Sequence, residues 1–248
     1  MSVEFYLVAA FAVLMTGVSK SGFAGGLGVL AVPLMSLFQT PQAAVTVMMP
    51  ILLVMDCANI WNYRHSWSWI YVKSLMPGAL CGIVVGAFTF QWMDPALLKL
   101  AIGGMALLFV LQFTCAQTIG RQARDSSRVV VFSLGALSGF ASFIAHAGGP
   151  PVKGYLLSRG MEKSLFVGTN SVFFFTLNLI KTVSYMALAQ YSQETLTASL
   201  LLTPFLVLGV LLGFRLHHLI SQMLFTRIAY LFLALAGTKL LWDGALLL

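Results

Sequence analysis

The chain has 248 residues, of which 59% are hydrophobic and only 8% are charged. Soluble domains carry about 25% charged residues, so a chain of this composition lacks the polar groups to cover a water-exposed surface. The composition excludes a soluble globular protein and predicts an all-α polytopic membrane protein in contact with lipid. The formal net charge of +7 does not indicate a nucleic-acid partner, because basic residues accumulate on the cytoplasmic loops of membrane proteins.

Ten apolar runs follow one another along the chain, and we expect each to form one membrane segment. Six of them have about 20 residues or more, which is the length that a helix needs to cross a hydrocarbon core ~30 Å thick. The second and the seventh run are too short for a continuous crossing. The runs span residues 3–19, 27–38, 42–63, 69–90, 95–116, 129–143, 147–157, 164–189, 196–216 and 225–244. The first run lacks a basic region before it, so we expect a membrane segment there and not a cleaved signal peptide.

A glycine-rich stretch occurs twice in the chain. It reads "SGFAGGLGVLAVP" over residues 21–33 and "SGFASFIAHAGGP" over residues 138–150, with the same offset at both ends (138 − 21 = 117; 150 − 33 = 117). A second pattern recurs with an offset of 127, as Pro77, Gly82 and Gly86 and then Pro204, Gly209 and Gly213. Two independent patterns of glycine and proline therefore predict an internal duplication.

The duplication divides the chain into a first repeat at 1–116, a cytoplasmic linker at 117–128 and a second repeat at 129–248, within one integrated transmembrane domain. Five segments per repeat is an odd number, so the second repeat enters the membrane from the opposite side. We therefore expect two inverted-topology repeats, an arrangement found in many secondary transporters, each with a short broken or re-entrant helix at its second position.

The distribution of basic residues predicts the orientation. With ten segments, one side keeps only Lys99, Lys181 and Lys239 of the 14 Lys and Arg residues, and the other side receives the remaining eleven (14 − 3 = 11), Lys20 among them. The side rich in basic residues is expected to be cytoplasmic. Both termini are then predicted to lie on the periplasmic side.

The two glycine-rich stretches predict helix breaks, since each glycine inside a helix costs roughly 1 kcal/mol relative to alanine. Broken backbone at membrane depth is tolerated only where it is buried in protein or lines a cavity. The helix after each break would direct its free N–H groups and its positive dipole end into that cavity, which would form an anion site. Close packing of helices through small residues is the alternative. The glycines concerned are Gly22, Gly25, Gly26, Gly28, Gly139, Gly148 and Gly149.

Four ionisable side chains lie away from the ends of the segments. Asp56 is deep in the run 42–63, and an intramembrane acid is a functional candidate by default, either as a coupling group or as the partner of a buried lysine. Lys181 and Lys153 either lend positive charge to an anion or extend their amines to the membrane interface. His146 falls inside the second glycine-rich stretch, where it would line the cavity or sense pH.

Uncharged polar residues complete the candidate site. Asn59, Thr169, Asn170 and Asn178 lie in the segments after the two breaks, where their side chains would hydrogen-bond an oxyanion while allowing its release. Hydrogen bonding between helices is the alternative role for these side chains. At Gly25, Gly26, Gly148 and Gly149, the backbone itself would approach the ligand.

Enzyme, cofactor and metal functions have no support in the sequence. It contains neither the H-E-x-x-H motif of zinc proteases nor the G-x-S-x-G motif of serine hydrolases. Cys57, Cys81 and Cys115 lie in apolar runs without the spacing of a zinc site, so we expect small buried side chains there. We therefore predict no enzymatic activity, no cofactor and no metal site.

Three stretches together resemble the sulfite exporter TauE/SafE family, also described as sulfonate permeases. They are "GFAGGLGVLAVPL" (22–34), "GALSGFASFIAHAGGPPVKGYLLSRG" (135–160) and "VGTNSVFFFTLNLIKTVSY" (167–185). The resemblance implies a permease of the bacterial inner membrane that moves sulfite or organosulfonates, often outward. The sequence departs from the family pattern at His146 and Ala147, where more glycine is expected.

The residues and the resemblance together predict a secondary transporter of small sulfur-containing anions that works by alternating access to a site at the membrane midplane. Its partners would be the anion, membrane lipid and a coupled proton, and the sequence leaves a homo-oligomer open. The alternative is a transporter of a cation or a neutral solute that uses Asp56 as its coupling or binding group. A scaffold without transport activity is a third hypothesis, and it predicts no response to any ligand.

Overall fold

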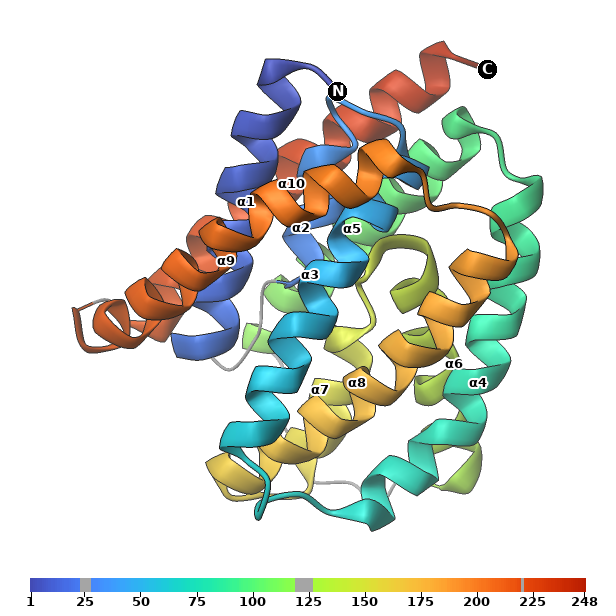
Figure 1. The fold of residues 1–248 in the computed structure, drawn as a ribbon. Coiled ribbons are helices and arrows are strands. Elements are labelled where there is room, and N and C mark those ends of the chain that lie inside the picture. Colours follow the sequence, from blue (N-terminus) through green and yellow to red (C-terminus); the bar gives the residue numbers. More distant parts are fainter. Residues whose placement is uncertain (23–27, 119–126, 220) are drawn as a thin grey trace.

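The computed structural model describes residues 1–22, 28–118, 127–219 and 221–248 (Figure 1). Within these ranges the chain forms ten α-helices and one 3-10 turn and contains no strand, so the all-α prediction is confirmed. Each predicted apolar run coincides with one helix to within a few residues, except that the second run forms η1 and α2 together. The elements are α1 (Val3–Gly22), η1 (Gly28–Leu30), α2 (Ala31–Met35), α3 (Pro41–Asn62), α4 (Trp69–Trp92), α5 (Pro95–Thr118), α6 (Arg128–Ala145), α7 (Gly149–Ser158), α8 (Lys163–Ala187), α9 (Gln193–Leu219) and α10 (Gln222–Leu246).

Eight helices of the described chain are long and apolar enough to cross a membrane, and the two short ones are α2 and α7. Large apolar side chains such as Leu200, Leu231 and Leu235 are exposed on the outer surface, where water would make them an aggregation hazard and lipid solvates them well. The protein is therefore a multi-pass membrane protein. Cys57, Cys81 and Cys115 are free and also exposed, so the expectation that they are buried is wrong.

The helices run alternately up and down through the molecule, and both ends of the chain lie at its top in Figure 1. The loops that follow α3 and precede α8 lie at the bottom, and they carry Arg64 and Arg159. The two termini thus share one side, and the basic loops share the other.

Close contacts between helix backbones hold the bundle together. α4 packs along α6, α9 along α1, and α5 along α10. A Cβ atom at Gly82 would lie 2.0 Å from the carbonyl oxygen of Ala136, and one at Gly139 would lie 2.0 Å from that of Ala79. Without side chains at these positions, the two backbones approach more closely than any other residue allows.

Gly139 lies inside the continuous helix α6, so the expected helix break at this residue is wrong. Gly22 is the last residue of α1, and residues 23–27 lie outside the described ranges. At Gly139, contact with α4 outweighs the roughly 1 kcal/mol by which glycine disfavours a helix. The alternative role of packing through small residues therefore holds for Gly139.

The break in the second glycine-rich stretch occurs later, at His146. This residue ends α6 in the left-handed region, with φ 52° and ψ 26°, and its N–H donates to the Ser142 carbonyl oxygen at 3.1 Å. Gly148 then precedes α7, whose first turn contains Pro150 and Pro151. Proline lacks an N–H group that this turn would leave unpaired in any case, so the start of α7 is as expected. In the first stretch, Gly25 and Gly26 lie outside the described residues.

Packing between α4 and α6 can be tested by adding one methyl group. Gly82→Ala places that methyl group against the backbone of α6, so we expect a loss of about 1–3 kcal/mol in unfolding free energy and a lower melting temperature in detergent. Gly104→Ala is the matched control, because nothing lies within 4 Å of a Cβ atom there, and we expect it to be neutral or stabilising. Equal melting temperatures for both variants would contradict the close packing.

Candidate functional site

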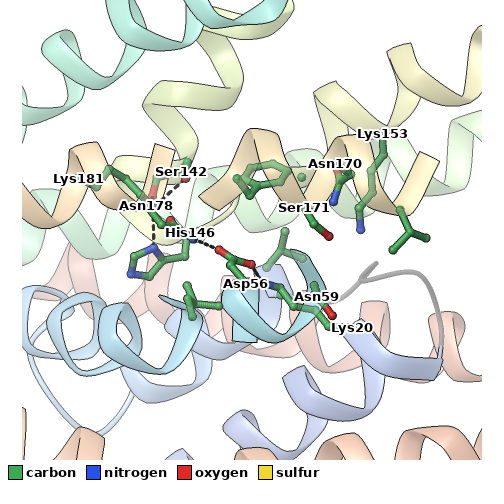
Figure 2. Close-up of a pocket in the computed structure, with 16 residues that line it drawn as sticks. Lys20, Asp56, Asn59, Ser142, His146, Lys153, Asn170, Ser171, Asn178 and Lys181 are labelled. Carbon is green, nitrogen blue, oxygen red and sulfur yellow. Dashed lines mark hydrogen bonds and ion pairs between the residues drawn. The ribbon is translucent and has the colours of Figure 1, made fainter. Parts of the chain in front are cut away.

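A cavity opens between α1, η1, α3, α6, α7 and α8 (Figure 2). Its volume of about 60 Å³ has room for several water molecules, since one water needs about 10–15 Å³. Apolar contacts come from Val29, Leu52, Val167 and Phe174, and the backbone of Gly28 and Gly149 also lines the space. The polar wall consists of Lys20, Asp56, Asn59, Ser142, His146, Lys153, Asn170, Ser171, Asn178 and Lys181.

Asp56 joins three helices across this cavity. Its Oδ1 accepts from the Lys20 ammonium of α1 at 2.8 Å, and its Oδ2 accepts from the Asn178 amide of α8 at 2.6 Å. The Asp56 side chain is only 2% exposed, whereas that of Lys20 is 17% exposed. A buried carboxylate is stable only when it is paired and hydrogen-bonded, and here both of its oxygens have a donor.

Lys181 is fully buried, so it does not extend to the membrane interface. Its ammonium lies 2.9 Å from the Ser142 carbonyl oxygen, 2.8 Å from the Ser142 hydroxyl and 2.9 Å from Nδ1 of His146. An ammonium has three protons, and these three acceptors take all of them. Lys181 therefore adds positive charge to the cavity while its hydrogen bonds stay within the protein.

His146 is held by its two ring nitrogens. Nε2 lies 2.8 Å from the Val45 carbonyl oxygen, which can only accept, so Nε2 carries the proton. Nδ1 is then the acceptor for Lys181, and the imidazole is neutral. The left-handed backbone at this position favours glycine, but only a histidine side chain makes both contacts.

Another part of the polar wall faces the cavity with hydrogen-bonding groups that the described chain does not use. The Ser171 hydroxyl and the Asn59 amide make no hydrogen bond to another described residue, and Oδ1 of Asn170 is buried without a partner there. Lys153 extends from α7 toward the same space, with its Nζ 3.9 Å from the Cβ position of Gly149. The Ser171 hydroxyl and the side-chain amides of Asn59 and Asn170 can both donate and accept, so they suit a small polar ligand.

The structure brings most of the predicted site residues to one cavity. These are Asp56, Asn59, His146, Gly149, Lys153, Asn170, Asn178 and Lys181. Two predicted residues lie outside its wall. The Gly148 carbonyl accepts from the Ser138 hydroxyl at 2.7 Å, and the Thr169 hydroxyl accepts from the Ser68 N–H at 2.9 Å.

Three polar residues of the wall were not predicted. Ser171 lies two helical turns before Asn178, and Ser142 lies one helical turn before His146, so helical spacing was a signal for both. Lys20 directly precedes the first glycine-rich stretch, but the charge distribution assigned it to the cytoplasmic side. In the described ranges, no three His, Cys, Asp or Glu side chains lie close enough together to hold a metal ion.

Comparison with known proteins gives one match. The family model described as Sulfite exporter TauE/SafE matches residues 9–240, which is nearly the whole chain. The chain belongs to the TauE/SafE sulfite exporter family. No curated protein and no solved structure matches the chain significantly. This match confirms the resemblance of the three sequence stretches to the family. The TauE/SafE proteins are membrane transporters, which agrees with the prediction that the chain is not an enzyme.

The ion pair in this TauE/SafE protein can be tested by a double-mutant cycle. Asp56→Asn leaves Lys20 without its counter-charge, so we expect a loss of about 3 kcal/mol in unfolding free energy. Lys20→Gln combined with Asp56→Asn should recover at least about 1 kcal/mol of that loss, because the two side chains are in contact.

The matched control is an exposed ion pair. Lys239 contacts Asp243 one helical turn away at 2.5 Å, and its side chain is 59% exposed. Lys239→Gln should cost less than about 0.5 kcal/mol. Strict additivity of the Lys20 and Asp56 substitutions in detergent unfolding would show that the buried pair is not coupled.

Proposed function

We propose that this transporter moves small sulfur-containing anions, such as sulfite or organosulfonates, across the bacterial inner membrane. The observation that carries the proposal is the charge of the cavity wall, where Lys20, Lys153 and Lys181 face one carboxylate, Asp56. Asp56 is already paired with Lys20, so the wall keeps an excess of positive charge in a region of low dielectric constant. An anion entering the cavity neutralises that excess.

The uncharged groups of the wall support the same assignment. Asn59, Asn170 and Ser171 supply donors whose neutral hydrogen bonds hold an oxyanion without trapping it. Gly149 places the start of α7 at the cavity, where backbone N–H groups and the positive end of the helix dipole favour negative charge. The charge of Asp56 is already neutralised by Lys20, so a cation would have to compete with that ammonium for the carboxylate.

We also propose that residues 1–116 and 129–248 are inverted repeats joined by the linker 117–128. The packing of the helices supports this symmetry. The first helix of each repeat packs on the fourth segment of the other, as α1 does on α9 and α6 on α4. The third segments, α3 and α8, pack on each other, as do the fifth, α5 and α10. With the basic loops on the cytoplasmic side, both termini are periplasmic.

Burial along the cavity supports alternating access. Lys181, which is 0% exposed, is the most deeply buried residue of the described wall, whereas Lys20 is partly exposed near the end that carries the basic loops. Beyond Lys181, one turn along α8, Tyr185 donates to the Phe143 carbonyl at 2.5 Å, and its ring packs on that of Phe143. In this proposal the structure is open toward the cytoplasm, and these aromatic rings close the periplasmic side.

Transport in proteoliposomes tests the proposal. We expect saturable flux of labelled sulfite and of sulfoacetate, and Lys153→Gln should reduce it at least about tenfold because a positive charge leaves the wall of a site with a low dielectric constant. Lys73→Gln is the matched control, since Lys73 is exposed on α4 and lies outside the cavity wall. Its flux should equal that of the unmodified protein.

A ligand panel separates this proposal from cation transport. Sulfite or an organosulfonate should raise the melting temperature of the purified protein, whereas divalent metals and amino acids should not. Stabilisation by a metal ion and by no sulfur oxyanion would overturn the proposed function in favour of a cation site at Asp56.

A further inference from the structure

Of the three hydrogen bonds of Lys181, only the one with the Ser142 hydroxyl can exchange its donor and its acceptor. Of the three groups around the Lys181 nitrogen, the Ser142 carbonyl oxygen can only accept, and Nδ1 of His146 also accepts because Nε2 holds the ring proton. A hydroxyl both donates and accepts, and its proton rotates freely about the C–O bond. The hydrogen bond between Lys181 and the Ser142 hydroxyl therefore depends on the protonation of Lys181.

When Lys181 is protonated, its ammonium donates to all three neighbours. The Ser142 hydroxyl then accepts from Lys181 at 2.8 Å, and its own proton points elsewhere. Ser142 lines the cavity, and no described residue accepts a hydrogen bond from its hydroxyl. The Ser142 proton is thus available to a ligand in the cavity (Figure 2).

When Lys181 is neutral, its amine has two protons and one lone pair. The two protons go to the Ser142 carbonyl oxygen and to Nδ1 of His146, and the lone pair accepts from the Ser142 hydroxyl. The hydroxyl proton is then withdrawn from the cavity. Every polar atom of this cluster keeps a partner in both states, and only one proton and one hydroxyl rotation distinguish them.

We propose that Ser142 couples the binding of one proton at Lys181 to the binding of one anion in the cavity. Protonation adds a positive charge and a hydrogen-bond donor to the cavity at the same time, and by reciprocity a bound anion favours protonation. The inference rests on the proposed function, because it assumes that the cavity takes an anion. It makes Ser142 a positioning residue for coupled binding of proton and anion.

The charged and titratable groups around Lys181 come from five elements. Asp56 on α3 favours the protonated amine, whereas Lys20 on α1 and Lys153 on α7 oppose it. His146, at the end of α6, is neutral, and its protonated Nε2 donates to the Val45 carbonyl oxygen. Tyr185, one turn further along α8, donates to the Phe143 carbonyl. Asp56 is itself bound to Lys20, so an arriving anion supplies the charge that the cluster lacks.

The test measures the affinity of purified protein for methanesulfonate from pH 5.5 to 9.5 by calorimetry, because this sulfonate stays ionised throughout. In the unmodified protein, the dissociation constant should rise with pH, by up to tenfold per pH unit once Lys181 loses its proton. For Ser142→Ala, affinity at low pH should be about tenfold weaker than in the unmodified protein, since one donor to an anion is lost. At high pH the two proteins should bind equally.

Ser171→Ala is the matched control. Its hydroxyl lies in the same cavity but makes no hydrogen bond to Lys181, so any loss of affinity should be the same at every pH. Ser142→Thr, which keeps the hydroxyl, should restore the affinity at low pH and the dependence of the dissociation constant on pH. The inference would be overturned if the ratio between the dissociation constants of Ser142→Ala and the unmodified protein stayed constant with pH. It would also be overturned if the unmodified protein bound methanesulfonate equally at every pH. Failure of sulfite and methanesulfonate to bind at any pH would instead overturn the proposed function.

Discussion

The arrangement of the site depends on supplying hydrogen-bond acceptors to one buried amine, that of Lys181. Lys181 lies where neither lipid nor bulk water reaches it, and an ammonium without partners there would cost many kcal/mol. Its three hydrogen-bond acceptors all come from the end of α6 and the turn after it, through Ser142 and His146. The helix must therefore end at His146, because another turn of regular helix would carry the imidazole away from both Lys181 and Val45.

This requirement extends outward to the helix packing. α6 holds Ser142 against α8 only if its own position is fixed, and α4 fixes it by backbone contact at Gly82 and Gly139. Such contacts leave little freedom to slide, since interiors packed at this density do not absorb an added methyl group. Gly139, which was predicted to interrupt a helix, thus contributes to the site indirectly, because its packing sets the depth at which the break at His146 falls.

The sequence predicts the fold well because the thickness of the membrane strongly constrains the length of each helix. Every apolar run forms one helix, except that the second run forms η1 and α2 together. It also singles out Asp56, Asn178 and Lys181, which line the cavity in the structure, since polar groups in apolar runs are rare. It misses Lys20 because the partner of Asp56 is 36 residues away, on a helix whose neighbours no local pattern predicts. It places a break at Gly139 because propensity alone does not show that α4 packs there.

The proposed repeats differ in chemistry although they share a glycine-rich pattern. The first contributes Lys20 and Asp56, which neutralise each other across α1 and α3. The second contributes Lys153, Lys181 and the neutral His146, and among the described lining residues it contributes no carboxylate. In our proposal the first repeat supplies the internal counter-charge that keeps the cavity stable, and the second repeat supplies the charge and the Ser142 donor that an anion meets. Specificity is then expected to follow substitutions between Ser142 and Lys153, where the second stretch departs from the first.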